Sequence, residues 1–361
     1  MEIPVYRPML TKSERSSLLS AFDSGWISGA GPQVNDAEHK LGQIYDCEAL
    51  AVCNGTAALH LALVAAGLGP GDKVLVPTFG YVAPANAAVY CGAVPIFVDC
   101  DCEHWQSTLN DFQRQYSEDI KGLIIVYTYG AQGRVLDVVT WARAEGLLVI
   151  EDCAEALGTR VGKELVGTLG DVAILSFYGN KTITCGEGGA VLSREPQIIE
   201  RAKKLRGQGL ASSRQYWHEV VGFNYRLSNV CASLLLPQIE RLDTILSQKT
   251  SINDWYIANL DSRLKTQQFT KGDIPWMTSA LLPDGIDRDS FTTSLKEVGI
   301  ETRPLFYPIH TMPPYFSSFS PLRSAESLAL RGFNLPSGPA TTKEELEFIS
   351  LTCTQLLDAA S

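Results

Sequence analysis

The chain has 361 residues, 45% of them hydrophobic and 19% charged, and carries a formal net charge of −10. It is long enough to bury a large core and to form two domains, and its composition is that of a globular protein. Because an acidic chain offers no positive field to a phosphate backbone, we expect no nucleic-acid partner. The N-terminus lacks the basic and apolar regions of a signal peptide, and no apolar run reaches the roughly 18 residues of a membrane span. We therefore expect a cytoplasmic protein without a membrane partner.

Short apolar runs recur between residues 73 and 191, and each is apolar throughout rather than alternating. This pattern is typical of strands that are buried on both faces of a sheet. Helix-length stretches such as 57–66 and 137–144 lie between several runs, which favours βαβ units and a mostly parallel sheet. The predicted fold class is therefore α/β. The runs are Val74–Val76, Ile96–Val98, Leu123–Val126, Leu147–Ile150 and Ala173–Leu175.

The pattern changes beyond about residue 192, where helical stretches replace the apolar runs. We expect a helix at 198–205 and one long helix through 229–246 that leads out of the first domain. Further stretches at 275–282, 291–298 and 344–357 predict a smaller α+β domain. We place the large domain at 1–245 and the smaller one at 246–361, with the N-terminal segment able to pack on the smaller domain.

The cysteines are odd in number and lie mostly in apolar surroundings, which indicates reduced thiols in the core rather than a disulfide framework. Cys100, Cys102 and His104 alternate along one segment, but a zinc loop usually spaces its cysteines more widely and needs a second pair of ligands. We therefore expect no metal. The nine cysteines are Cys47, Cys53, Cys91, Cys100, Cys102, Cys153, Cys185, Cys231 and Cys353.

Polar residues follow several of the predicted strands, at the edge where an open α/β sheet binds its ligands. Asn54-Gly55-Thr56 opens a helix whose free N–H groups suit a phosphate, although an ordinary N-cap is the commoner role. Asp152 closes a strand, where its carboxylate either pairs with a protonated pyridine nitrogen or only caps the next turn. Ser176 also ends a strand, and its hydroxyl can donate a hydrogen bond to the same phosphate.

Lys181 follows Ser176 by five residues and lies in a Gly-Asn-Lys-Thr loop between two apolar runs. A single lysine is usually a solvated surface charge, but desolvation in such a loop can produce a nucleophilic amine. The loop is not a P-loop, because no glycine directly precedes the lysine. An ATPase site is therefore excluded.

These residues lie in motifs that resemble the DegT/DnrJ/EryC1/StrS family of sugar aminotransferases over nearly the whole chain. The resemblance implies a fold type I enzyme that uses pyridoxal phosphate (PLP), with a mostly parallel mixed sheet in its large domain. It also implies a homodimer whose active sites form at the interface. The motifs are Trp26-Ile-Ser-Gly, Asn54-Gly-Thr-Ala-Ala-Leu, residues 77–86, Glu151-Asp-Cys-Ala-Glu-Ala-Leu-Gly, residues 176–189, Gly222-Phe-Asn-Tyr-Arg-Leu-Ser-Asn229 and Gly299-Ile-Glu-Thr-Arg.

The same resemblance implies a role for each residue that matches a family motif. Lys181 would carry PLP as a Schiff base, and Asp152 would pair with the pyridine nitrogen. Tyr81 would stack on the cofactor ring. Asn229 would reach the phosphate from the neighbouring subunit, and Gly55, Thr56 and Ser176 would form the phosphate cradle of the same subunit. Candidate substrate contacts are Trp26, Arg226 and His310.

Three positions depart from the family pattern. Glu155 occupies a site near the 3′ oxygen of the cofactor where relatives often carry Gln or His, and a carboxylate beside a phenolate must be protonated or bridged. Tyr127-Thr-Tyr-Gly130 replaces the common His-Leu-Tyr-Gly, so a ring contact there is not assumed. Cys185 replaces the usual Thr or Ser in a glycine-rich loop, where a small residue is tolerated.

The resemblance implies transfer of an amino group from L-glutamate to C4 of a nucleotide-linked 4-keto-6-deoxyhexose. It is strongest to the family branch that forms GDP-perosamine from GDP-4-keto-6-deoxy-D-mannose, a sugar of surface polysaccharides such as the O-antigen of lipopolysaccharide. A UDP- or dTDP-linked sugar, or amination at C3, remains an alternative. A dehydratase on the same fold would carry His in place of Lys181, and a non-catalytic binding relative would be expected to lose Lys181 or Asp152.

Overall fold

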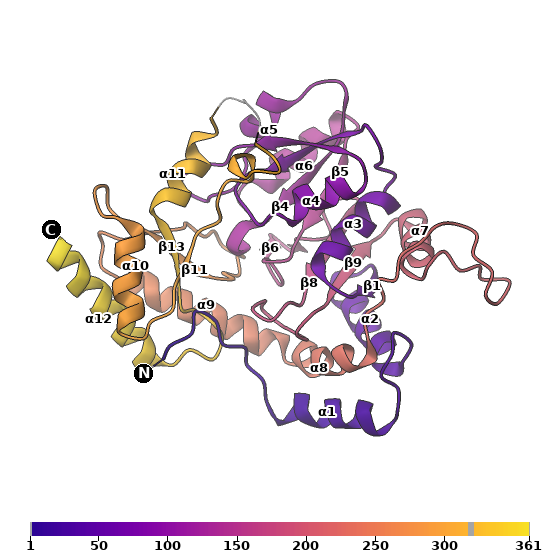
Figure 1. The fold of residues 1–361 in the computed structure, drawn as a ribbon, viewed down its shortest axis with the longest axis horizontal. Helices are drawn as coiled ribbons and strands as arrows, with labels where there is room; N and C mark the ends of the chain where they lie inside the picture. The colour runs from indigo at the N-terminus through magenta and orange to yellow at the C-terminus, as the bar shows by residue number, and fades with distance from the viewer. Residues whose placement is uncertain (1, 317–320, 361) are drawn as a thin grey trace.

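The computed structural model describes residues 2–316 and 321–360 (Figure 1). Its large sheet has seven strands in the order β1-β9-β8-β5-β4-β2-β3. Only β9 among them runs antiparallel to its neighbours; the other neighbouring pairs are parallel. The strands are β1 (Glu48–Val52), β2 (Lys73–Pro77), β3 (Val94–Val98), β4 (Ile120–Val126), β5 (Leu148–Asp152), β8 (Val172–Ser176) and β9 (Gly189–Ser193). The predicted α/β class with a mostly parallel mixed sheet is confirmed.

Both faces of this sheet are covered by helices, because successive strand residues point to opposite sides. In β5, Val149 belongs to one core cluster and Ile150 to the other. One cluster contains residues of α3 (Gly55–Ala65), α4 (Ala83–Tyr90) and α7 (Pro196–Arg206). The other contains residues of α2 (Pro32–Tyr45), α5 (Leu109–Gln115), α6 (Val135–Ala144) and α8 (Asn229–Glu240). This arrangement explains why the strands are apolar throughout.

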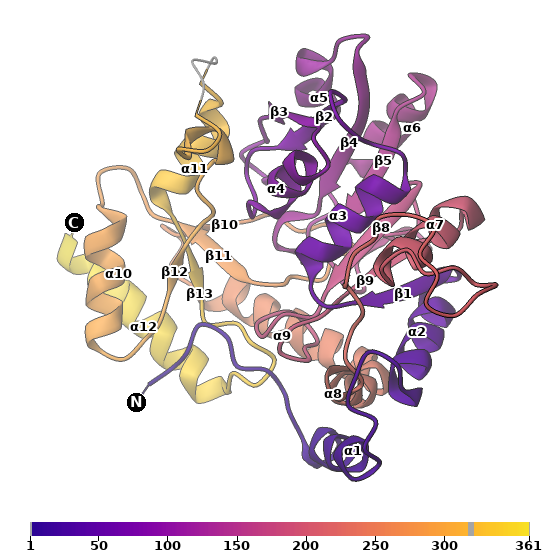
Figure 2. The same cartoon turned by 45° about the vertical axis from the view of Figure 1, so that its right-hand side comes forward.

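A second, smaller sheet lies beside the large one, as Figure 2 shows. It has four antiparallel strands in the order β10-β11-β13-β12 and packs with three helices. The elements are β10 (Lys265–Thr266), β11 (Thr278–Leu281), β12 (Arg303–Pro304), β13 (Gly332–Leu335), α9 (Leu242–Asn259), α10 (Arg288–Glu297) and α12 (Lys343–Ala360). The remaining elements are α1 (Lys12–Asp23), α11 (Arg323–Arg331), the hairpin β6 (Arg160–Val161) and β7 (Glu164–Leu165), and short 3-10 turns at Thr128–Gly130 and Ile309–Thr311.

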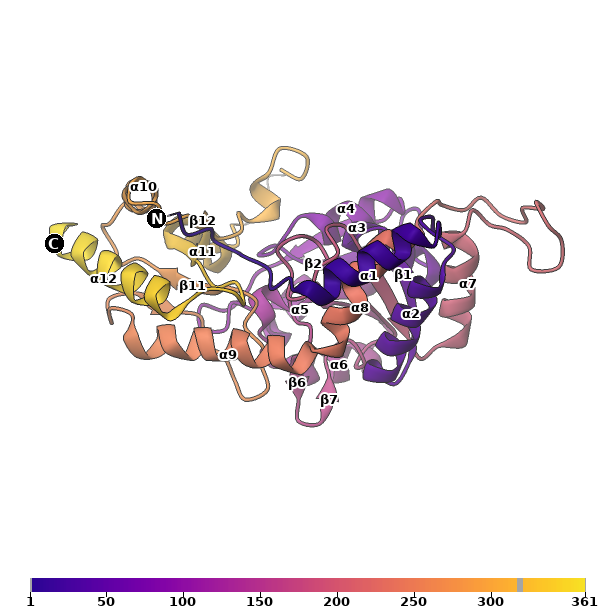
Figure 3. The ribbon, with the colours of Figure 1, turned by 90° about the horizontal axis from the view of Figure 1, so that it is seen from below.

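Helix α9 runs from the large sheet to the small one without interruption, as seen from below in Figure 3. It spans the predicted boundary at residues 245 and 246, and that division of the chain stays a prediction. The N-terminal segment crosses between the same two parts, because Ile3 pairs with Ile300 and its N–H donates to the Gly299 carbonyl at 2.8 Å. Both segments therefore hold the small sheet against the large one.

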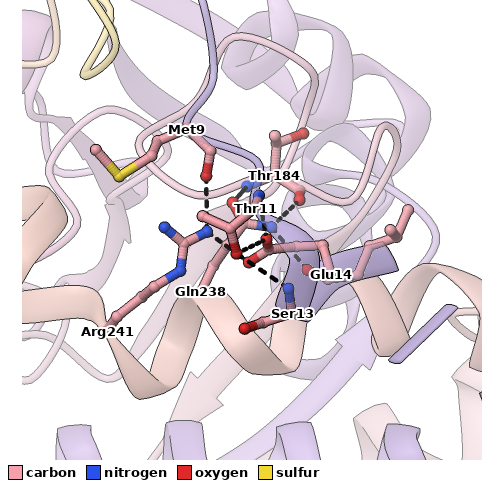
Figure 4. Close-up of polar contacts among 8 residues, drawn as sticks. Met9, Thr11, Ser13, Glu14, Thr184, Gln238 and Arg241 are labelled. Carbon is pink, nitrogen blue, oxygen red and sulfur yellow. Dashed lines mark hydrogen bonds and ion pairs between the residues drawn. The ribbon is translucent and has the colours of Figure 1, made fainter. Parts of the chain in front are cut away.

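The single long helix expected over 229–246 is in fact two helices. Helix α8 ends at Glu240 and α9 begins at Leu242, because Arg241 has non-helical angles of φ −114° and ψ 26°. The Arg241 guanidinium donates to the Met9 carbonyl at 2.7 Å and to Glu14 Oε1 at 2.5 Å. These partners lie in the N-terminal segment and α1, and Figure 4 shows them closing around Arg241.

Candidate active site

Strands β1, β8, β5, β4 and β2 all point the same way, so the loops that follow them meet at one edge of the sheet. These loops and residues around the small sheet surround a cavity of about 1000 Å³. Seven of the eight residues expected at the cofactor line it, together with residues around the small sheet that include Trp276 and Arg303. The seven are Gly55, Thr56, Tyr81, Asp152, Glu155, Ser176 and Lys181.

One end of the cavity is formed by the first turn of α3. Asn54 caps this helix, because its side chain accepts a hydrogen bond from the Ala57 N–H at 2.8 Å. The first N–H groups of a helix have no partner within it and favour an anion. A Cβ added to Gly55 would lie 2.9 Å from Ser176 Cβ, so only glycine allows β8 to approach the helix this closely. Gly55, Thr56 and Ser176 thus form a compact cradle suited to a phosphate.

Asp152 ends β5 on the floor of the same cavity. Its Oδ1 accepts a hydrogen bond from the Ala154 N–H at 3.0 Å. Burial raises the pKa of this carboxyl to about 6, while the nearby Lys181 charge and the Ala154 bond act in the opposite direction. A buried carboxylate of this kind gains most from a cationic ligand, as a protonated pyridine nitrogen would be.

Lys181 is largely buried, with 12% of its side chain exposed. Its Nζ lies 3.2 Å from Glu155 Oε1 and 3.9 Å from the centre of the Trp276 ring. The carboxylate and the aromatic face both attract the ammonium group. The amine is therefore held inside the cavity rather than extended into solvent.

Glu155 is bridged rather than isolated. Its Oε2 accepts the Tyr129 N–H at 2.8 Å while its Oε1 contacts Lys181. Tyr129 itself has a positive φ of 58°, which turns its N–H toward this carboxylate. The Glu155 side chain is thus fixed by one main-chain donor and one ammonium group.

An aromatic wall formed by Tyr129 and by residues next to the small sheet was not anticipated from the sequence. The Tyr129 ring stacks between Trp276 and Phe306, with ring centres 6.0 and 5.0 Å apart. Tyr81 also lines the cavity; its ring centre lies 6.3 Å from that of Phe306, and 60% of its surface is exposed. Arg303 of β12 lines the same space. It supplies the only guanidinium among the described residues that line the cavity. The Gly-Ile-Glu-Thr-Arg motif at 299–303 was the one sequence signal that pointed to this side.

Of the described residues that line the cavity, none is Asn229, Trp26, Arg226 or His310. Asn229 is fully buried, and its amide binds the Trp26 carbonyl at 2.8 Å and the Val34 N–H at 3.3 Å of its own chain. Trp26 and Arg226 are exposed outside the cavity. Their roles at a shared site stay predictions.

His310 is buried and is not among the residues that line the cavity. Its Nδ1 shares a 2.8 Å hydrogen bond with the Thr78 hydroxyl, and its Nε2 lies 3.1 Å from Glu326 Oε1. Both ring nitrogens are therefore engaged with protein groups, and this geometry fits a structural residue better than a substrate contact.

Cys185 lies in the glycine-rich loop after Lys181 and is buried. Its thiol donates a hydrogen bond to the Glu187 carbonyl at 3.2 Å. The thiol of Cys231 and burial both raise the pKa of Cys185.

Across residues 2–316 and 321–360, the structure shows no group of three His, Cys, Asp or Glu side chains placed to hold a metal. Over the same residues, no helix is both long and apolar enough to span a membrane.

The profile of the DegT/DnrJ/EryC1/StrS aminotransferase family matches residues 8–352. The chain belongs to this family. It is 42% identical to the GDP-perosamine synthase of Escherichia coli O157:H7 over 350 residues, which are 96% of each chain. It is 39% identical to the GDP-perosamine synthase of Vibrio cholerae over 355 residues, 96% of this chain and 97% of the relative. The aminotransferase TlmJ of Streptoalloteichus hindustanus has the same fold, with a TM-score of 0.95, 26% identity and full coverage of both chains.

Membership of the DegT/DnrJ/EryC1/StrS family makes the chain a PLP-dependent sugar aminotransferase. The cavity fits this cofactor. The cradle at Gly55 and Ser176 suits its phosphate, the buried Asp152 carboxylate suits its ring nitrogen, and the Lys181 amine suits its aldehyde. When bound, PLP supplies an electron sink that stabilises negative charge on a substrate carbon.

Proposed function

We propose that the protein transfers an amino group from L-glutamate to C4 of GDP-4-keto-6-deoxy-D-mannose and so forms GDP-perosamine. The observation that carries this proposal is the near-complete match to GDP-perosamine synthases at 42% and 39% identity, together with a lysine and an aspartate in one cavity. UDP- or dTDP-linked sugars and amination at C3 are the competing outcomes. The reaction would take place in the cytoplasm, and its product would be used in the synthesis of a surface polysaccharide such as O-antigen.

Each residue of the cavity has a part in this proposal. Lys181 would hold the cofactor through its aldehyde, and its free amine would move a proton to and from the substrate carbon. Asp152 would keep positive charge on the ring nitrogen, and Tyr81 would cover one face of the ring. Glu155, which contacts both Lys181 and the Tyr129 N–H, would keep the free lysine amine near the reacting carbon and would stabilise its ammonium form once it has taken up the proton.

The protein would act as a homodimer with shared sites. Several large apolar side chains are exposed on α1 and the following loop and on the arm formed by residues 207–226, which projects from the body after α7 (Figure 1). Apolar groups exposed in such number mark an interaction surface. They are Phe22, Trp26, Ile27, Tyr216, Trp217 and Val221.

The role of Lys181 is tested by colour. The purified protein with PLP should be yellow, and Lys181→Ala should lose the lysine-dependent absorbance and nearly all activity. Lys163→Ala, a change at an exposed lysine of the β6–β7 hairpin, serves as the matched control. A chromophore that survives Lys181→Ala unchanged would overturn the assignment.

The substrate is tested by assays with glutamate and 4-keto-6-deoxyhexoses linked to GDP, UDP or dTDP. The GDP sugar should have the highest kcat/KM, and NMR of the product should place the new amine on C4. A preference for a UDP or dTDP sugar, or a C3 product, would replace the proposed substrate while leaving the transaminase chemistry in place.

A further inference from the structure

Lys249 is a buried lysine on the helix that runs from the large sheet to the small one. It lies on α9 with 2% of its surface exposed, and burial lowers its pKa to about 7. Its Nζ donates to the main-chain carbonyls of Trp276 and, at 2.5 Å, of Ser337. Within the described part of the chain, no carboxylate lies at ion-pair distance from it. Burial of a lysine without a carboxylate partner lowers the stability of the folded protein, which suggests that its two contacts have a function.

The first contact leads to the cavity through Trp276. Lys249 fixes the main chain of this residue, and the indole face lies 3.9 Å from Lys181 Nζ. The indole N–H donates to the Asn180 carbonyl at 2.7 Å. Trp276 thus contacts both the side chain of Lys181 and the peptide group that precedes it.

A second route leads through Tyr6. The Lys249 ammonium lies 5.2 Å from the centre of the Tyr6 ring, and the Tyr6 hydroxyl donates to the Lys181 carbonyl at 2.8 Å. The two carbonyls on either side of the Lys181 Cα are therefore held by two residues that both contact Lys249. Lys249 itself is not among the described residues that line the cavity.

We propose that Lys249 is a positioning residue for Lys181. Its buried ammonium ties α9, the N-terminal segment and the small domain together, and so holds Trp276 and Tyr6 against residues 180 and 181. The Lys181 amine is thereby kept between the indole face and Glu155. The inference rests on the proposed role of Lys181 as the amine that binds the cofactor.

The test measures the chemical reactivity of Lys181 without using the enzyme reaction. Apoenzyme is treated with limiting trinitrobenzenesulfonate, and peptide mass spectrometry gives the labelling rate of Lys181 against pH. Lys249→Met should raise this rate about tenfold near neutral pH, because the amine loses the indole face that covers it and becomes more accessible to the reagent. The rate of PLP capture, followed by absorbance, should fall by a similar factor because the amine is no longer held in place.

Asn253→Leu is the matched control. Asn253 is also buried on α9 and also contacts the small domain, since its Oδ1 accepts from the Thr278 hydroxyl at 3.1 Å. This substitution should lower stability but leave Lys181 labelling unchanged. An equal rise in labelling in both variants would mean that any loosening of the junction has the same effect, and would overturn the specific role of Lys249.

Two further variants keep the inference falsifiable even if Lys249→Met does not fold. Trp276→Phe and Tyr6→Phe each interrupt one route and should each change Lys181 labelling, and Lys249→Met should add nothing in the background that carries both. If neither single variant changes the labelling rate, the proposal is wrong. A failure of the proposed function would show differently, as PLP colour that does not depend on Lys181.

Discussion

The environment of Asp152 disfavours the charged form of its carboxyl group unless a cationic ligand is bound beside it. Burial raises its pKa from 3.8 to about 6. In the unfolded chain the same carboxyl releases its proton near pH 4. Between these values the folded apoprotein binds more protons than the unfolded chain, so its stability falls as pH rises through that window.

Asp152→Asn should therefore stabilise the apoprotein above pH 6. A shift of about two pKa units corresponds to roughly 3 kcal/mol, which is the upper limit of the gain expected at pH 8. At pH 4 the gain should vanish, because the carboxyl is then neutral in the folded protein. Urea unfolding at the two pH values measures both quantities.

The same substitution should abolish tight PLP binding, because an amide cannot balance a protonated ring nitrogen. Asp137→Asn, a surface change at the start of α6, is the control for the pH series. An Asp152→Asn gain that is equal at pH 4 and pH 8 would show that the carboxyl carries no burial penalty.

At the scale of elements, α8 clamps the loop that carries Lys181. The Thr184 N–H donates to Gln238 Oε1 at 3.0 Å, and the Gln238 amide donates to the Thr184 carbonyl at 2.6 Å. Figure 4 shows this pair beside the Arg241 contacts to α1. The first turns of α1, the end of α8 and the lysine loop are thus joined by side chains.

Gln238→Leu should loosen this loop. It leaves both polar main-chain groups of Thr184 buried without their partner, at a cost of about 1–3 kcal/mol each. We expect faster amide hydrogen exchange over residues 182–186 and about tenfold weaker retention of PLP. Gln248→Leu is a matched control on α9, because the buried Gln248 Oε1 has no hydrogen-bond partner among the described residues and its removal should cost little. Unchanged exchange in Gln238→Leu would show that the loop is held by other contacts.

The elements that form the site could be predicted from the sequence where they depend only on neighbouring residues. Apolar runs gave the parallel strands, and a strand that ends in a polar residue placed Asp152 and Ser176 at the ligand edge. The break at Arg241 was not predictable, because its partners Met9 and Glu14 lie 232 and 227 residues away in the sequence. Trp276 was missed for the same reason, since only the packing of the small domain brings it to Lys181.

At the scale of the whole molecule, the cavity is lined by residues around both the large and the small sheet, while large apolar side chains remain exposed elsewhere. Tyr216 and Val221, on the arm of residues 207–226, are 88% and 92% exposed. Side chains of this kind are usually covered in the functional state of a protein. A second copy of the chain is the partner that we propose, and Val221→Asp should shift the dimer toward monomer in sedimentation experiments.

Sharing of sites between two copies is tested by mixing two variants that are each inactive. If Asn229 acts on the cofactor of the partner, a heterodimer of Lys181→Ala and Asn229→Ala has one site with both residues intact. Random mixing makes about half of the dimers heterodimers, so activity should recover to about a quarter of the wild-type value. If Asn229 acts only within its own chain, where it binds the Trp26 carbonyl and the Val34 N–H, neither site is intact and the mixture stays inactive. When both variants also carry Val221→Asp, the mixture should not recover activity. The chains then stay monomeric, and no site with both residues can form.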